Sequence, residues 1–461
     1  MAGSLPRAIR ELPSNTTAGL KPDVRLVLPF HSMIQRERHG IRFLRAFSVR
    51  FRSKSVAVRV FRSQLKGVPA YLLDASPISQ GGSVYSSDAS LDGEKYAFFS
   101  LAALELPRVL NWQLQILHAN DWHTALAVYW LLLRQRAGEF PGVASVLTVH
   151  NLAFTGPTLA RDLVDSGKDK MTAKLPRWGR RRPLPLGLCS AGAIVAVSPT
   201  YALEIQTAAF GVGLQRFLRQ RRESLQGILN GIDVDVFNPA RDPALSASFD
   251  VRNLTRRALN KTALQARLNL PVNPEVTILG VVARLDPQKG SDLVAPALRR
   301  LRDHDWQAVV LGTGHPRHET ALRRLQKEFP DRVRVEIRFD DALARQIYGG
   351  ADLLLMPSRY EPCGLSQMIA MRYGCIPVVT AVGGLRDTVV DGELGIVMGA
   401  PTSTRLASAV GRAIKLRADM PRWSRMQRAC MSHDFSWAPS ARRYLELYKS
   451  LLPLPAPRAT R

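Results

Sequence analysis

Glu361 is the residue whose type and position most suggest chemistry. It follows a short apolar run, residues 351–356, that predicts a buried parallel strand. Further along, Gly383 and Gly384 follow a second apolar run at 376–380. A carboxylate and a Gly-Gly turn at the carboxyl ends of neighbouring strands are typical of ligand sites in open α/β sheets. The pattern alone fits two ordinary strand-to-helix connections equally well.

Two cations, Arg284 and Lys289, occupy a turn between the apolar run 279–283 and an expected helix. Both therefore stand at the carboxyl end of a strand, where fixed positive charge can stabilise a leaving group that gathers negative charge. Spacing alone also allows a solvated surface pair, and that alternative stays open.

Several polar residues follow other expected strands. His150 ends one strand and precedes Asn151, and Asp121 and His123 follow another. A lone histidine is more often a core or surface residue than a ligand. Its place at the carboxyl end of a strand favours a functional role for His150.

The composition bounds the class of protein. A chain of 461 residues is too long for one hydrophobic core, so two domains are expected. With 46% hydrophobic and 22% charged residues it is globular, and no apolar run reaches the roughly 18 residues that span a bilayer. The first residues lack the apolar segment of a secretion signal. The four cysteines, at 189, 363, 375 and 430, lack metal-binding spacing, so reduced thiols in the cytoplasm are expected.

The charge is strongly positive, with 64 Lys and Arg against 38 Asp and Glu and a net charge of +26. Such an excess favours anionic partners such as nucleotides. Nucleic acid is the alternative, but the chain lacks the signatures of zinc fingers, helix-turn-helix motifs and basic-aromatic platforms. We therefore expect no nucleic-acid partner and no membrane partner.

The apolar pattern predicts an α/β protein with parallel sheets and right-handed crossovers. Strands are expected at 24–28, 56–61, 68–73, 114–117, 143–149, 193–197, 276–282, 306–311, 333–337, 351–356 and 376–380. Helices are expected at 3–12, 95–110, 122–137, from 199, and at 290–301, 318–329, 343–348 and 437–452. Residues 74–95 are expected as a polar loop, 238–245 as an interdomain linker, and 168–185 as a loop without an assigned role.

Eight motifs occur in one order along almost the whole chain. They are His118-Ala-Asn-Asp-Trp-His-Thr124, Thr148-Val-His-Asn-Leu152, Val197-Ser-Pro-Thr-Tyr201, Gly227-Ile-Leu-Asn-Gly-Ile-Asp233, Arg284-Leu-Asp-Pro-Gln-Lys-Gly290, Gly312-Thr-Gly314, the stretch around Glu361, and Gly383-Gly-Leu385. With them the sequence resembles the bacterial glycogen synthases and plant starch synthases of glycosyltransferase family 5.

The resemblance implies the GT-B fold, in which two Rossmann-like domains face each other across a cleft that holds the active site. The N-terminal, acceptor-side domain would comprise residues 1–240, incomplete at its start. The C-terminal domain, 241–435, would bind the nucleotide sugar. Residues 436–461 would form a helix that returns to the first domain, followed by a tail.

The resemblance also implies roles for individual residues. Arg284 and Lys289 would hold the distal phosphate, and Glu361 would contact the hydroxyls of the donor glucose. His150 would bind the same sugar through its primary hydroxyl, with Asn151 nearby, and Asp121 would lie near the donor or acceptor sugar. The donor-binding stretches further include Cys363, Gly364, Gly383, Gly384 and Leu385, and His123 and Tyr201 would line the cleft. For Cys363 a buried packing role is an equal alternative, and packing also competes for Tyr201.

The reaction implied is transfer of glucose from ADP-glucose to an α-1,4-glucan such as glycogen, with retention of configuration by front-face substitution. Neither a cofactor nor a metal is expected, because Arg284 and Lys289 supply the charge and an Asp-x-Asp dyad is missing. Two alternatives remain. One is a non-catalytic glucan-binding relative, and the other is a transferase of the same fold that uses UDP-glucose.

The sequence departs from the family at its start. The family begins with a strand and a Lys-x-Gly-Gly-Leu loop, whereas this chain begins at Met1-Ala-Gly-Ser-Leu-Pro6, which corresponds to the following helix. Either the true start lies upstream, or the chain is a truncated member. We expect the chain as written to be less stable than one extended by the strand, because the strand's neighbours would lack hydrogen-bond partners.

Overall fold

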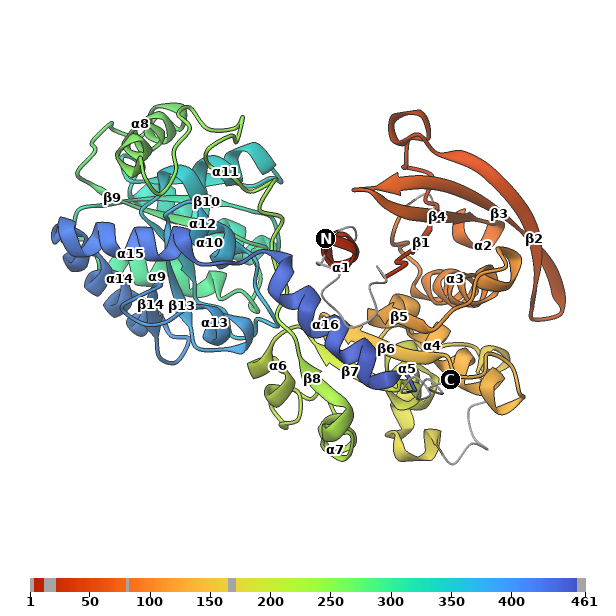
Figure 1. Cartoon of the computed structure of the whole chain (residues 1–461). Helices are drawn as coiled ribbons and strands as arrows, with labels where there is room; N and C mark the ends of the chain where they lie inside the picture. The colour runs from red at the N-terminus through yellow and green to blue at the C-terminus, as the bar shows by residue number, and fades with distance from the viewer. Residues whose placement is uncertain (1–3, 12–21, 80–82, 165–170, 454–461) are drawn as a thin grey trace, which may run out of the picture. The chain divides into compact units, whose positions relative to one another are not determined.

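The structure, a computed structural model, describes residues 4–11, 22–79, 83–164 and 171–453 (Figure 1). The chain divides into two compact units. Unit 1 contains the residues up to Leu229 and the segment that begins at Trp437, and unit 2 runs from Asn230 to Ser436. Among the described residues, no helix is long and apolar enough to cross a bilayer.

The chain passes from unit 1 to unit 2 after Leu229, before the domain boundary expected after residue 240. The expected linker, 238–245, therefore belongs to unit 2. Asp242 in that segment is buried and accepts a hydrogen bond from the hydroxyl of Tyr373. Its carboxylate also lies 3.5 Å from a guanidinium nitrogen of Arg345. The segment lacks periodicity and so resembles a linker, but its paired polar side chain holds it in the interior of unit 2.

Unit 2 is built on a six-stranded parallel sheet of order β11-β10-β9-β12-β13-β14. Its strands are β9 (Thr277–Val282), β10 (Trp306–Leu311), β11 (Val333–Glu336), β12 (Leu353–Met356), β13 (Ile376–Thr380) and β14 (Ile396–Met398). Its helices are α8 (Arg257–Arg267), α9 (Ser291–Arg300), α10 (Pro316–Glu328), α11 (Asp341–Gly350), α12 (Ser366–Arg372), α13 (Gly383–Thr388), α14 (Ser403–Ala418) and α15 (Met420–Ser432). Figure 1 shows α8 and α11 on one side of the sheet and α9 and α14 on the other, so the central strands are buried on both faces.

The strand order of unit 2 reverses between β9 and β12. From β9 the chain runs outward through β10 to β11, then returns to β12 and continues in the other direction through β13 to β14. In open α/β sheets ligands bind at such a reversal, outside the carboxyl ends of the strands. The carboxyl ends of β9 and β12 therefore mark the expected site of unit 2.

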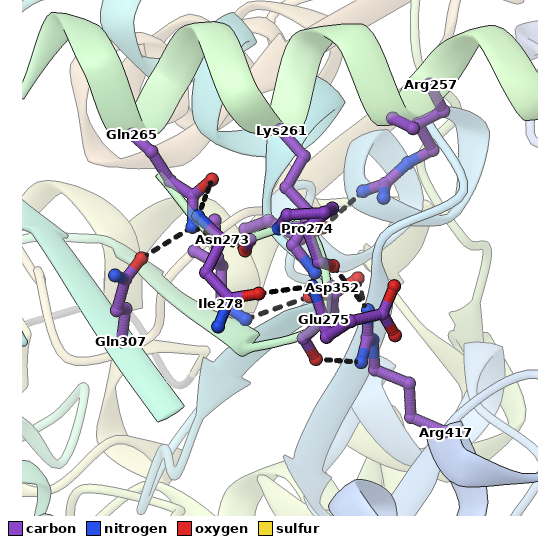
Figure 2. Close-up of polar contacts among 12 residues, drawn as sticks. Arg257, Lys261, Gln265, Asn273, Pro274, Glu275, Ile278, Gln307, Asp352 and Arg417 are labelled. Atoms are coloured by element: carbon purple, nitrogen blue, oxygen red, sulfur yellow. Dashed lines mark hydrogen bonds and ion pairs between the residues drawn. The ribbon is translucent and has the colours of Figure 1, made fainter. Parts of the chain in front are cut away.

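Asp352 links β9 to β12 at the amino ends of the two strands, opposite to the expected site. Its Oδ2 accepts hydrogen bonds of 2.8 Å from the backbone N–H of Ile278 and from Nζ of Lys261. Its Oδ1 lies 3.3 Å from Nε of Arg417 on α14. Figure 2 shows these groups around the carboxylate. The cluster fixes the two central strands, and thereby the turns at their far ends.

The described residues of unit 1 form two four-stranded sheets, where the sequence predicted one Rossmann-like half. The parallel sheet has the order β5-β6-β7-β8, with β5 (Ile116–Asn120), β6 (Ala144–Val149), β7 (Ala193–Ala196) and β8 (Leu225–Gly227). The mixed sheet has the order β1-β4-β3-β2, with β1 (Leu26–Pro29), β2 (Arg42–Phe51), β3 (Lys54–Leu65) and β4 (Val68–Asp74). Only β1 and β4 pair in parallel there, because short turns join β2, β3 and β4 as antiparallel neighbours.

The helices of unit 1 are α1 (Ser4–Glu11), α2 (Ser76–Ser79), α3 (Ala89–Val109), α4 (Asp121–Arg136), α5 (Pro183–Ser190), α6 (Pro199–Glu204), α7 (Gln215–Gln220) and α16 (Trp437–Leu451). The polar loop expected at 74–95 is wrong at both ends, because α2 occupies Ser76–Ser79 and α3 already begins at Ala89. The Asp88 carboxylate caps that helix by accepting from the backbone N–H of Ser90 at 2.8 Å.

The last helix, α16, packs within unit 1 (Figure 1). Ala441, Tyr444 and Leu447 join Val146 of β6 and Val195 of β7 in one buried cluster. The chain thus closes the face of the parallel sheet with its last described helix.

Candidate active site

The turns after β9 and β12 bring a cation and a carboxylate into contact. Lys289 Nζ lies 2.6 Å from Glu361 Oε2, and Ser358 Oγ donates a hydrogen bond of 3.1 Å to the same oxygen. The Glu361 side chain is 6% exposed and that of Lys289 is 20% exposed. A carboxylate that is this buried requires such partners. Two residues that the sequence placed at separate strand ends therefore form one charged group.

Gly290 allows this close approach of the two turns. Its φ is +67°, and a Cβ at this position would lie 2.1 Å from the carbonyl oxygen of Pro357, just after β12. The backbone N–H of Lys289 also donates to Asp286 Oδ1 at 2.9 Å. The turn after β9 is thus held against the end of β12 by a position that only glycine can occupy.

Arg284 is the more accessible of the two predicted cations. Its side chain is 57% exposed, and Nη1 lies 2.8 Å from Asp286 Oδ2. Nη2 donates to Gln288 Oε1 at 3.1 Å. The guanidinium is therefore oriented by its own turn and still open to an anionic ligand.

A cavity of about 200 Å³ opens at these strand ends. Its lining includes Arg284 and Lys289 from the turn after β9, and Met356, Pro357 and Ser358 from the end of β12. Two cations and a hydroxyl in one concave space suit a phosphate group. In the part of the chain that the structure describes, no three His, Cys, Asp or Glu side chains cluster as metal ligands would.

The Gly383–Gly384 turn packs directly on the segment that carries Glu361. A Cβ on Gly384 would lie 2.0 Å from the carbonyl oxygen of Cys363, and the N–H of Gly384 donates to the Glu361 carbonyl at 3.1 Å. Leu385 is fully buried, and its N–H donates to a carbonyl of the same turn at 3.0 Å. The sequence placed Gly383, Gly384 and Leu385 in a donor-binding stretch, and that role stays a prediction. In the structure the N–H groups of Gly384 and Leu385 are bonded within the protein, so the turn packs closely against the loop that carries Glu361.

Cys363 and Gly364 shape the same loop. Cys363 is 5% exposed, and burial raises the pKa of its thiol to about 12, so the thiol stays protonated at neutral pH. Gly364 has a φ of +69°. The Gln367 side-chain amide donates hydrogen bonds of 3.1 Å to the carbonyls of both residues. The packing role of Cys363 is thus the one that its surroundings favour.

In unit 1, Asp121 holds the backbone that follows β6. Its Oδ1 accepts hydrogen bonds from the backbone N–H of His150 at 2.7 Å and of Asn151 at 3.4 Å. Asp121 has a left-handed φ of 52°, a strained conformation that is common at functional sites. Burial raises the pKa of the Asp121 carboxyl and lowers the pKa of the His150 imidazole, and the attraction between the two groups opposes both shifts. The structure thus brings three predicted residues together.

His123 and Tyr201 differ in their surroundings. His123 stacks on Trp122 with ring centroids 4.2 Å apart, and burial lowers the pKa of its imidazole to about 4. Tyr201 is fully buried, and its hydroxyl accepts a hydrogen bond of 2.8 Å from the backbone N–H of Leu152. Of the two roles expected for Tyr201, cleft lining and packing, its burial favours packing. It supports the loop after His150 from beneath.

The exposed aromatic residues near these strand ends include Phe339 and Tyr85, which the sequence analysis did not single out. Phe339 follows β11 and is 92% exposed. Tyr85 is 55% exposed, and its hydroxyl lies 2.8 Å from His123 Nε2. The sequence does contain a pattern that predicts exposure of Phe339, because this aromatic residue lies between charged residues in Arg338-Phe-Asp340.

Two family profiles match the chain. The one described as the starch synthase catalytic domain matches residues 1–220, and the one described as glycosyl transferases group 1 matches residues 264–429. A glycogen synthase from Bacillus cereus is 36% identical over 466 residues, which cover 98% of this chain and 95% of that protein. A glycogen synthase from Anaeromyxobacter dehalogenans is 40% identical over 474 residues, with the same shares covered.

Solved structures agree with these matches. The catalytic domain of starch synthase IV from Arabidopsis thaliana, bound to ADP and acarbose, has a TM-score of 0.83 and 32% identity, and the match covers 93% of this chain and 92% of that one. A sucrose-phosphate synthase from Thermosynechococcus elongatus, 20% identical with a TM-score of 0.56 over 84% of each chain, shows likeness of fold alone.

Proposed function

Because the chain belongs to the family of bacterial glycogen synthases and plant starch synthases, which are glycosyltransferases of glucan synthesis, we propose that it transfers glucose from ADP-glucose to the non-reducing end of an α-1,4-glucan with retention of configuration. The α/β fold of the GT-B type expected from the sequence is confirmed by the likeness to starch synthase IV.

The contact that carries the proposal is the Lys289–Glu361 pair at the strand reversal, 2.6 Å across and beside Arg284. Release of a nucleoside diphosphate concentrates negative charge on the leaving group. Fixed cations in a crevice stabilise that charge without reorganising during the reaction. The carboxylate beside Lys289 would accept hydrogen bonds from hydroxyls of the glucose attached to the same diphosphate.

In the proposed reaction the bond between the anomeric carbon and the diphosphate oxygen breaks, and its electron pair stays on the diphosphate. Arg284 and Lys289 stabilise that charge, while Glu361 stabilises positive charge on the sugar. The acceptor hydroxyl then attacks from the face that the diphosphate leaves, and its proton passes to a departing phosphate oxygen. Configuration is retained because both bonds lie on the same face of the sugar.

His150 and Asn151 would hydrogen-bond the transferred glucose. Burial lowers the pKa of His150, so a neutral imidazole is favoured, and a neutral imidazole can donate to or accept from a hydroxyl. Asp121, whose Oδ1 already accepts from both backbone N–H groups, would act as a positioning residue for them.

Phe339 would bind the base of the donor. It follows β11 at the carboxyl edge of the sheet that carries Arg284, and its ring is 92% exposed. Aromatic faces stack on nucleobases with little preference among them. The choice of ADP over UDP therefore rests on the likeness to starch synthase IV, whose structure holds ADP.

The test measures transfer of labelled glucose to glycogen from ADP-glucose and, in parallel, from UDP-glucose. We expect kcat/KM to favour ADP-glucose by about tenfold or more, which is ~1.4 kcal/mol of transition-state binding. Phe339→Ala should raise the donor KM and leave kcat close to that of the parent. A preference for UDP-glucose would overturn the donor assignment. Glycogen binding without transfer from either donor would favour the non-catalytic alternative.

A further inference from the structure

Trp178 presents its indole at the surface of unit 1. It lies in the 3-10 helix η4 (Arg177–Arg181), and 41% of the residue is exposed. The turn that carries it is well fixed. The N–H of Gly179 donates to the carbonyl of Pro176 at 2.9 Å, and the Arg180 guanidinium donates to two carbonyls of the preceding turn at 3.2 and 3.1 Å. The exposure of the ring is therefore not the result of a loosely held segment.

A strained loop before α7 stands beside the indole. Val212 is 42% exposed and has a φ of 50°, which is an outlier for a β-branched residue. Gly213 has a φ of +80°, and a Cβ there would lie 3.3 Å from the indole Nε1. The N–H groups of Gly211 and Leu214 donate to carbonyls within the loop at 2.8 and 2.7 Å, and Leu214 is fully buried. Strain of this kind persists where the surroundings impose it, and it clusters at ligand clamps.

A line of contacts joins this surface to the start of α4. The Arg182 guanidinium lies 5.9 Å from the centre of the Trp178 ring and donates to the carbonyl of Gly156 at 2.8 Å. A Cβ on Gly156 would lie 2.9 Å from the ring of Trp122, which in turn stacks on His123. The exposed indole is therefore continuous with the part of unit 1 that carries the predicted sugar-binding residues.

We propose that Trp178, with Val212 and Gly213 beside it, binds an α-glucan chain, the acceptor class of the proposed function on which this inference rests. A glucose ring has an apolar C–H face that stacks on a flat indole, and a hydroxyl rim that can meet neighbouring polar groups. A nucleic-acid strand would also stack, but its phosphates need cations that are not already engaged. Arg182, the cation nearest the ring, already donates to the Gly156 carbonyl and to Thr155 Oγ1, which favours a neutral ligand. Arg177, next to the indole in the chain, is exposed, so nucleic acid is the alternative that the RNA measurement below tests.

The test measures binding of the full chain to glycogen by affinity electrophoresis in the absence of any donor. Trp178→Ala should raise Kd about tenfold, equivalent to ~1.4 kcal/mol. Trp178→Phe should stay within about threefold of the parent, because it keeps an aromatic face. Leu259→Ala, which removes a 56% exposed side chain on α8 of unit 2, is the matched control and should change nothing. Thermal unfolding of each variant shows that the fold is retained.

Steady-state kinetics of the same variants provide a second measurement. Trp178→Ala should raise the KM for glycogen and leave the donor KM and the kcat at saturating glycogen unchanged. Glycogen binding equal to that of the parent would overturn the inference, and so would a selective loss of binding to a single-stranded RNA oligomer. A parent chain that binds glycogen through Trp178 but transfers no glucose would refute the proposed function and leave the inference standing.

Discussion

Lys289 Nζ and Glu361 Oε2 lie 2.6 Å apart although 72 positions separate the two residues in the sequence. They come from the turns after β9 and β12, the strands on either side of the reversal. Because the carboxylate is buried, the ammonium both balances its charge and adds a positive group to the cavity lining. One side chain thus links the stability of the site to its proposed chemistry.

Replacing Lys289 by Ala should lower transfer severely with little change in fold. Loss of a fixed donor to a developing negative charge lowers kcat by about 10²- to 10³-fold. The variant also leaves Glu361 with Ser358 as its remaining side-chain partner, which should lower the free energy of unfolding by about 1–3 kcal/mol. Steady-state kinetics with labelled ADP-glucose and urea unfolding measure the two effects.

A double variant separates these effects. Lys289→Ala combined with Glu361→Gln removes the unpaired charge, so stability should recover while transfer stays lost. Arg299→Ala, which breaks an exposed pair with Glu328, is the matched control and should leave transfer intact. Unchanged turnover of Lys289→Ala would refute the phosphate role.

Gly384→Ala should disrupt the loop that carries Glu361. The added Cβ would lie 2.0 Å from the Cys363 carbonyl, and backbone atoms cannot yield as a flexible side chain can. We expect a loss of about 3 kcal/mol or more together with loss of transfer. Gly399→Ala is the matched control, because its Cβ would meet nothing closer than 3.9 Å. Equal melting temperatures for the two variants would show that the turn can move.

The sheet of unit 2 was largely predictable from the sequence. The apolar runs at 276–282, 306–311 and 351–356 correspond to β9, β10 and β12, because strands covered on both faces are apolar at most positions. By contrast, β2 (Arg42–Phe51) was not predicted. It is an edge strand whose residues are mostly exposed, so its sequence lacks the alternation on which such a prediction depends.

The site was predictable as a set of residues at strand ends, but not as a set of contacts. Whether Lys289 meets Glu361 depends on the approach that Gly290 allows, and no local pattern contains that information. The burial of Tyr201 and the engaged N–H of Gly384 likewise arise from packing between distant segments. Sequence spacing therefore predicted which residues lie at the strand ends. It did not predict which hydrogen-bond donors and acceptors each of them contacts.

His118 should make the stability of the protein depend on pH. Its Nδ1 lies 2.6 Å from the Tyr448 hydroxyl and its Nε2 lies 2.7 Å from Thr148 Oγ1. Burial lowers the pKa of the imidazole to about 3, against 6.5 in an unfolded chain. Between those values the unfolded state binds a proton that the folded state does not, so stability falls as pH falls from 6.5 towards 3. The slope is at most ~1.4 kcal/mol per pH unit, because a single proton is involved.

Melting temperature against pH measures this contribution. His118→Gln should show a shallower fall between pH 6 and 4 than the parent, since the titrating group is gone. His433→Gln, at an exposed histidine, should follow the parent curve. Parallel curves for all three proteins would assign the acid sensitivity to other groups.

Asp352→Asn should loosen unit 2 from the side opposite the cavity. The Asp352 side chain is 6% exposed and meets both Lys261 and Arg417, with the buried Arg257 nearby (Figure 2). Burial already lowers the pKa of Lys261, and the Asp352 charge opposes that shift. Asparagine keeps an acceptor for the backbone N–H of Ile278 but removes the charge that compensates two cations. We expect a loss of about 3–5 kcal/mol, seen by calorimetry as an earlier transition.

Two further variants test whether charge is the cause. Adding Lys261→Met to Asp352→Asn removes one uncompensated cation and should recover part of the lost stability. Asp391→Asn, which breaks an exposed pair with Arg412, should change stability by no more than about 0.5 kcal/mol. Arg417 also donates to the carbonyls of Pro274 and Glu275. If Asp352→Asn has the same melting temperature as the parent, backbone acceptors are enough to stabilise the buried cations. Asp352 would then stabilise β9 only through its hydrogen bond to the N–H of Ile278.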